Sequence, residues 1–314
     1  GSYQLRATLE FPGGASAAWS ATVLNLAPGW ADSLAVRAES VDALDRRTVA
    51  HYLSAVRTAV EGHLPRRHPG AIATTLGDLD AMLTRAAATG SILPANGPAV
   101  IVHPGADGGD RLCTVYRPRP GAARGAETPV LVIDDAPGGA ELFAGRFDLF
   151  YTHGDLGGAG EWHPLYLVPH LPGRGRAAEA RAALEFARRR FATDAVPVAG
   201  VDGGGATALH LAVDGGGGLA ALMLLAGAGF DPWPGATDAE LSSRLESLPR
   251  GLPVDWTGFT RETGGAGPAS AVRRALATAG ADLTSRSAGG GLSLSQAADR
   301  IVLWAEDLPV PGVE

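Results

Sequence analysis

The feature that most constrains the fold is the alternation of short apolar runs with helical segments from residue 99 to residue 304. The clearest apolar runs have the length and composition of strands that are buried on both faces. They are residues 129–133, 195–199 and 219–225. Residues 176–191 and 294–304 have the longer patterns of helices. Such alternation predicts an α/β fold, doubly wound, with a mostly parallel sheet that helices cover on both faces.

Weaker patterns complete this predicted domain. Strands are expected at residues 99–102, 111–116, 148–152, 165–168 and 254–259, and helices at residues 206–213 and 269–279. No internal repeat interrupts the series. The alternation therefore indicates one domain at residues 96–314.

Residues 1–95 carry a different pattern. The expected elements are strands at residues 3–11 and 21–26 and helices at residues 40–63 and 76–87. Ser40 is a candidate N-cap for the first of these helices. We therefore expect an N-terminal accessory segment of strands and helices over residues 1–95.

Composition argues against several classes of partner. The formal net charge is -7 and no basic stripe stands out, so a nucleic-acid partner is not expected. No apolar run reaches the roughly 18 to 20 residues of a membrane span. Cys113 is the single cysteine, which excludes an intramolecular disulfide. The expected partner is a small molecule or another protein, and the sequence does not choose between them.

The pattern that points to a site is the turn after the run at residues 195–199. Residues 200–205 read Gly-Val-Asp-Gly-Gly-Gly and lead into a helix of small residues. A strand, a Gly-x-Asp-x-Gly turn and a helix have the form of a nucleophile elbow, which raises one side chain above the sheet. That side chain is Asp202. The amide of Gly203 would then be a donor to an oxyanion.

With this turn, the order of motifs resembles the α/β-hydrolase superfamily, above all its feruloyl-esterase-like, polyhydroxybutyrate-depolymerase-like and related peptidase-like branch. The resemblance covers roughly residues 100–308. The matching segments are residues 133–139, where the branch has a His-Gly turn, 169–175, 200–205 and 224–229. It implies an α/β-hydrolase-type sheet, oxyanion-hole positions at Gly203, Asp135 and Ala136, and a secreted or periplasmic protein.

The departures from that branch fall on its catalytic residues. Asp202 stands where the branch has serine, and residues 287–292, where its histidine is expected, contain none. Glu262 is the candidate for the acid, beyond Asp255 within the preceding run. Loss of one triad member costs a factor of about a million in proteases. The sequence therefore favours a pseudoenzyme with a degenerate catalytic triad that binds a ligand or a partner, or serves in assembly.

A second hypothesis keeps activity. Haloalkane dehalogenases and epoxide hydrolases use an aspartate nucleophile in the same kind of turn, and this resemblance implies an atypical hydrolase acting on an ester, an epoxide or a halide. The ester intermediate needs a histidine to activate water. His153, His163 or His170 would have to supply it from another loop.

Carboxylates gather at the expected strand ends. If Asp134, Asp135 and Asp202 lie together, the cluster should raise the pKa of one of them or hold Ca²⁺ or Mg²⁺. The simpler interpretation is that Asp202 caps its own helix, and no cofactor is predicted. His210 and the tryptophans Trp162, Trp233 and Trp256 are expected to be packing residues, with a ligand pocket as the alternative for the tryptophans.

Overall fold

The computed structural model describes residues 2–10, 12, 14, 16–61, 69–118, 128–136, 138–153, 163–172, 175–215, 217–227, 230–259, 268–287 and 291–308. The chain divides into two compact units, Gly1–Pro94 and Ala95–Glu314. None of the helices within those residues combines the length and the apolar character that a membrane span requires.

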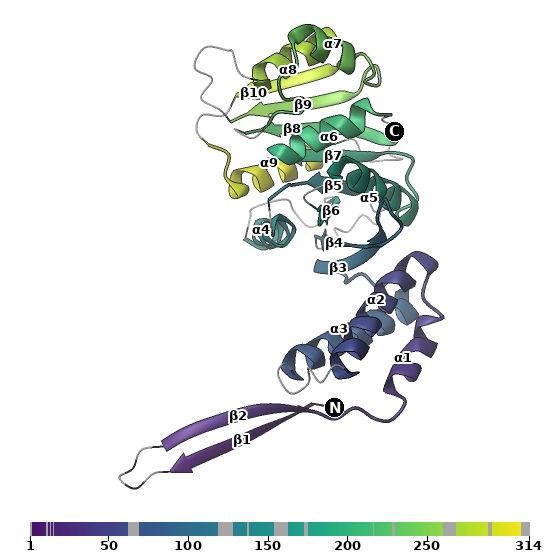
Figure 1. The fold of residues 1–314 in the computed structure, drawn as a ribbon, viewed down its shortest axis with the longest axis vertical. Coiled ribbons are helices and arrows are strands. Elements are labelled where there is room, and N and C mark those ends of the chain that lie inside the picture. The colour runs from purple at the N-terminus through teal and green to yellow at the C-terminus, as the bar shows by residue number, and fades with distance from the viewer. Residues whose placement is uncertain are drawn as a thin grey trace. The chain divides into compact units, whose positions relative to one another are not determined.

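The N-terminal unit contains a hairpin and helices (Figure 1). Its described elements are β1 (Ser2–Glu10), β2 (Ser16–Leu24), α1 (Trp30–Ala38), α2 (Ala43–Glu61) and α3 (Pro69–Thr89). The two strands pair antiparallel from Ser2↔Leu24 to Glu10↔Ser16. Helix α1 was not predicted from the sequence.

The start of α2 differs from the prediction. Ser40 does not cap it, because its hydroxyl donates to the carbonyl oxygen of Arg37 at 2.8 Å, at the end of α1. The carboxylate of Asp42 instead accepts a hydrogen bond from the amide of Leu44 at 2.9 Å. The predicted helix began three residues before α2, because the apolar period already includes Val41 in the preceding turn, and the period alone does not show where a helix begins.

The C-terminal unit is built on an eight-stranded, mostly parallel sheet, in the order β10-β9-β8-β7-β5-β6-β4-β3. Its strands are β3 (Gly97–Pro104), β4 (Asp110–Arg117), β5 (Pro129–Ile133), β6 (Leu165–Pro169), β7 (Val196–Val201), β8 (Leu219–Ala226), β9 (Pro253–Gly258) and β10 (Asp282–Ser287). Strand β4 runs antiparallel to both of its neighbours, β3 and β6. The other described strand pairs of this sheet are parallel. The predicted α/β fold with a mostly parallel sheet is confirmed.

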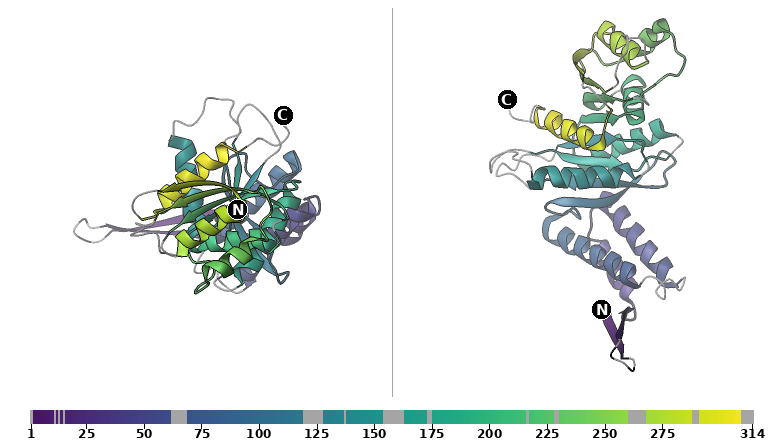
Figure 2. Two further views of the ribbon diagram at one scale, coloured as in Figure 1. Left: turned by 90° about the horizontal axis from the view of Figure 1, so that it is seen from above. Right: turned by 90° about the vertical axis from the view of Figure 1, so that its left-hand side faces the viewer.

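Helices cover both faces of this sheet (Figures 1 and 2). They are α4 (Gly139–His153), α5 (Arg176–Arg190), α6 (Gly203–Val213), α7 (Asp238–Leu245), α8 (Pro268–Thr278) and α9 (Leu294–Glu306). Helices α4 and α9 pack together on one face, and α5 and α6 pack together on the other. Strands β5 and β7 are neighbours in the sheet, but the helices that follow them, α4 and α6, lie on opposite faces. Such a change of face places a crevice at the carboxyl ends of the two strands.

Three elements of this unit differ from the sequence prediction, and one of them, helix α7, was not predicted at all. Residues 148–152, expected as a weak strand, belong to α4, because Phe143, Phe147 and Tyr151 recur every four residues and pack against the same core. Strand β10 was not predicted, since Asp282, Thr284 and Arg286 give it polar residues at alternate positions.

The core under α4 and α9 centres on aromatic rings. Phe147 has no exposed surface, and its ring stacks on that of Tyr166 with 4.3 Å between centroids. Interiors are close-packed, so the loss of such a ring leaves a cavity that neighbours fill only in part.

We expect Phe147→Ala to lower the free energy of unfolding by about 3–5 kcal/mol. Leu142→Ala on the same helix is the control, because Leu142 is 58% exposed and a surface change there should stay within about 0.5 kcal/mol. Urea unfolding followed by circular dichroism measures both. Equal shifts for the two variants would contradict the packing described for α4.

Candidate functional site

Asp202 occupies a sharp turn between β7 and α6. Its backbone has φ 51° and ψ -117°, in the positive-φ region that residues other than glycine rarely adopt. The amide of Asp202 donates to the carbonyl oxygen of Leu225 at 2.9 Å, which ties the turn to the neighbouring strand β8. This is the backbone of a nucleophile elbow.

Glycines bring the helix against the sheet at this turn. A Cβ on Gly204 would overlap the carbonyl group of Ile133 at the end of β5. A Cβ on Gly200 would lie 2.5 Å from the Cα of Gly205 and 2.7 Å from the Cβ of Ala208. Only glycine permits these approaches, so the sequence of the turn places the start of α6 beside the end of β5.

The side chain of Asp202 does not cap α6. No capping hydrogen bond reaches it from the first turn of that helix, so the helix-cap interpretation is wrong. Its carboxylate instead lies over Gly227 after β8, where a Cβ would be 2.7 Å from Oδ1. The positive φ turns the side chain away from the amides of its own helix.

Asp134 directly follows β5, and its carboxylate packs against Gly139, the first residue of α4. Burial raises the pKa of Asp134, and the charges of Asp135 and Asp202 raise it further. The backbone amides of Ala136 and Asp135 act in the opposite direction, because they are directed at this carboxylate and favour its charged form. The pKa of Asp134 is thus raised chiefly by burial, and the neighbouring carboxylates make smaller contributions.

Asp135 is the second carboxylate of the cluster. Its Oδ2 accepts a hydrogen bond from Nη1 of Arg176 at 3.0 Å, and both side chains are about one-third exposed. The same carboxylate lies against Gly203, where it occupies the space that a Cβ would take. A negative charge therefore stands beside the residue whose amide was expected to stabilise an oxyanion.

Arg176 was missed by the sequence analysis. It is the first residue of α5, where the helix dipole disfavours a cation. A cation at the start of a helix is stabilised by a nearby carboxylate. An arginine at that position of the predicted helix could therefore have indicated a pair with one of the aspartates after residue 133.

The histidines considered as substitute bases have other partners. His163 Nδ1 lies 2.9 Å from Oε1 of Glu306. His170 Nε2 lies 2.8 Å from the hydroxyl of Thr114, and its Nδ1 lies 3.6 Å from Glu141. The side chain of His153 is outside the described residues.

The remaining sequence candidates are dispersed. Glu262 and Trp162 lie outside the described residues. Asp255 lies in the middle of β9, not at its carboxyl end. Trp256 is buried. His210 on α6 bonds the carbonyl oxygen of Pro232 at 2.7 Å and packs against Trp233.

A cleft of about 220 Å³ opens at the carboxyl ends of β5 and β6. Its charged and ionisable lining residues are Asp134, Asp135, Glu141, His170 and Arg176. Across the part of the chain that the structure describes, no three His, Cys, Asp or Glu side chains are grouped so as to hold a metal ion.

Comparison with known proteins adds little at this distance. No family model and no curated protein matches the chain. Solved structures that resemble it include a poly(aspartic acid) hydrolase from Sphingomonas sp. KT-1 (13% identity, TM-score 0.46, 68% of this chain and 99% of that one). Another is a dienelactone hydrolase from Anabaena variabilis (14% identity, TM-score 0.47, 68% of this chain and 97% of that one). A third is a post-proline cleaving enzyme from Rickettsia typhi (13% identity, TM-score 0.43, 67% of this chain and 37% of that one). Similarity this low carries no inference about activity.

Removal of the Asp134 charge should stabilise the protein in a pH-dependent way. The folded-state pKa of Asp134 is raised above the ordinary 3.8, so the folded protein holds this proton more tightly than the unfolded chain does. The contribution of Asp134 to the free energy of unfolding of the wild type therefore falls as pH rises above 3.8. We expect the stability of Asp134→Asn relative to wild type to increase between pH 4 and pH 7, measured by urea unfolding.

Asp194→Asn makes the same change of net charge in the exposed turn after α5 and serves as the control. If the free energy of unfolding of Asp134→Asn fell relative to that of wild type as pH rises, the raised pKa of the Asp134 carboxyl would be contradicted.

Proposed function

We propose that this α/β-hydrolase-fold protein has a degenerate catalytic triad, does not catalyse hydrolysis, and binds a small ligand with a positive charge in the cleft after β5 and β6. One observation carries the proposal: the carboxylate of Asp135 lies against Gly203, the residue whose amide an α/β hydrolase would direct at the oxyanion of its intermediate. The amides of Asp135 and Ala136, the other expected donors, act on the carboxylate of Asp134 and lower its pKa.

Electrostatics supports the loss of acyl transfer. An oxyanion hole works because preorganised donors point to the place where negative charge develops. Here the loop donors serve a resident carboxylate, and the carboxylate of Asp135 lies against Gly203. Negative charge that developed above Asp202 would meet repulsion from both aspartates in place of stabilisation.

The alternative is an atypical hydrolase with Asp202 as nucleophile, acting on an ester, an epoxide or a halide. The elbow conformation of residue 202 favours it, since that backbone holds a side chain above the sheet. Its weakness is the base, because His163 and His170 make their described hydrogen bonds to Glu306 and Thr114. We therefore rank binding above catalysis.

The charges of the cleft favour a cationic ligand. Arg176 is paired with Asp135, and Glu141 is 60% exposed at the side chain. Asp134 carries a carboxylate whose charge is only partly compensated, as its raised pKa shows. An ammonium group between Asp134 and Glu141 would offset the repulsion within the cluster.

The first test is hydrolysis of p-nitrophenyl acetate and styrene oxide by wild type and Asp202→Asn. We expect neither protein to exceed the rate in buffer, because His163 and His170, two of the histidines considered as bases, are hydrogen-bonded to Glu306 and Thr114. Turnover by wild type that Asp202→Asn abolishes would overturn the non-catalytic proposal in favour of the aspartate-nucleophile hydrolase.

The second test is binding of benzylamine, with neutral benzyl alcohol as the matched probe, by calorimetric titration. We expect benzylamine to bind more tightly than benzyl alcohol, and Glu141→Gln to weaken benzylamine about tenfold, in the range of a charge-assisted contact worth ~1.4 kcal/mol. Asp194→Asn should bind like wild type. Equal binding of the amine and the alcohol would contradict a cation site.

A further inference from the structure

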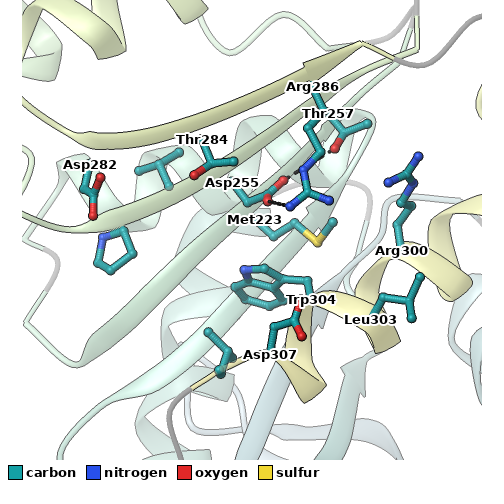
Figure 3. Close-up of a pocket in the computed structure, with 13 residues that line it drawn as sticks. Met223, Asp255, Thr257, Asp282, Thr284, Arg286, Arg300, Leu303, Trp304 and Asp307 are labelled. Carbon is teal, nitrogen blue, oxygen red and sulfur yellow. Dashed lines mark hydrogen bonds and ion pairs between the residues drawn. The ribbon is translucent and has the colours of Figure 1, made fainter. Parts of the chain in front are cut away.

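A second cleft, of about 230 Å³, lies beside the last turns of α9 (Figure 3). Helix α9 packs against β7 and β8, and the cleft lies between that helix and the adjacent strands β9 and β10. It shares no lining residue with the cleft after β5 and β6. An inference from it is therefore independent of the function proposed above.

The floor of this cleft is a polar surface of the sheet. Met223 of β8 is in register with Asp255 of β9, and Asp255 is in register with Thr284 of β10. Side chains alternate along a strand, so Asp282 and Arg286 share the face of Thr284. Met223 belongs to the core under α9, which places the whole row on the face that α9 covers only in part.

Asp255 is the most enclosed charge in the cleft, with a side chain only 12% exposed. Burial raises its pKa, and Arg286, Thr257 and Arg300 counteract the rise in part. The ion pair to Arg286 is loose, at 3.8 Å. Arg300 forms no salt bridge with any residue that the structure describes, although it lies close enough to influence Asp255. One cation of the cleft is thus available to a ligand.

The charges are separated along the cleft (Figure 3). Arg286 and Arg300 lie toward one end, Asp282 lies at the other, and Asp307 follows the last turn of α9. Four strand residues separate the Cα atoms of Asp282 and Arg286 by about 13 Å. Seven helical residues separate Arg300 from Asp307 by about 10 Å. The indole of Trp304 lines the space between them.

A ligand that complements this pattern is long and dipolar. A simple anion would meet Asp255, Asp282 and Asp307, and a simple cation would meet two guanidinium groups. An extended peptide of two or three residues spans about 7–10 Å between its charged ends. Its carboxylate would suit the planar donors of arginine, and a central apolar side chain would cover Trp304.

We propose that this cleft binds a short linear peptide, with its C-terminal carboxylate at Arg286 and Arg300 and its N-terminal ammonium at Asp282. Asp255 then acts as a fixed charge that orients Arg286. The ligand remains partly exposed, because the cleft is small and open along β10.

The test uses one tripeptide, Gly-Phe-Gly, in four forms: both ends free, N-acetylated, C-amidated, and blocked at both ends. Calorimetric titration into the full chain should show that the free form binds, and that either block weakens binding about tenfold. Loss of one charge-assisted contact accounts for a change of that size, ~1.4 kcal/mol.

Two variants assign the ends. Arg300→Gln should erase the difference between the free and C-amidated forms, and Asp282→Asn should erase the difference between the free and N-acetylated forms. Arg189→Gln, an exposed arginine of α5, is the matched control and should leave all four affinities unchanged. Unfolding midpoints equal to that of wild type would show that the variants fold.

Three results would overturn the proposal. They are equal binding of the four forms, an undiminished effect of C-amidation in Arg300→Gln, and no binding of the free form at millimolar concentration. None of these depends on the cleft after β5 and β6, so a failure here leaves the amine-binding test unaffected.

Discussion

The close approach of helix α6 to strand β5 is the constraint on which the site depends. Gly204 lies so near the carbonyl of Ile133 that no side chain fits between them. This contact brings the turn after β7 beside the turn after β5, and with it Asp202 beside Asp134 and Asp135. The approach of the two turns is therefore a product of backbone packing, and the aspartates at positions 134, 135 and 202 make it acidic.

The cluster has an electrostatic cost that the loop backbone partly offsets. The carboxylates of Asp134, Asp135 and Asp202 lie near one sheet edge. Arg176 forms an ion pair with Asp135, and two backbone amides lower the pKa of Asp134. Donors committed to a resident charge are not free for a reaction intermediate. The same feature that makes the cluster tolerable also opposes the charge that develops in acyl transfer, and this is the reason why we propose binding at this site.

Much of the fold could be predicted from the sequence, because buried parallel strands such as β5 and β7 are continuous apolar runs. Strand β10 could not, since its alternating polar residues face a cleft that only the tertiary structure creates. Residues 148–152 were misassigned because a short apolar run does not distinguish a strand from a helix segment. In the site, the sequence placed Asp202 in its turn, but the direction of the Asp135 and Ala136 amides depends on backbone angles that composition does not encode.

The strained backbone of residue 202 has an evolutionary consequence. Its positive φ is imposed by β7 and α6 on either side, and such strain costs on the order of 1–3 kcal/mol for any residue with a Cβ. The scaffold bears this cost with aspartate as it would with serine, so exchange of this one residue would place a hydroxyl group in the same turn. If the protein is non-catalytic, as we propose, turnover would still need a second change, because the carboxylate of Asp135 would remain against Gly203. Hydrolysis would then be at least two coordinated steps away from this arrangement.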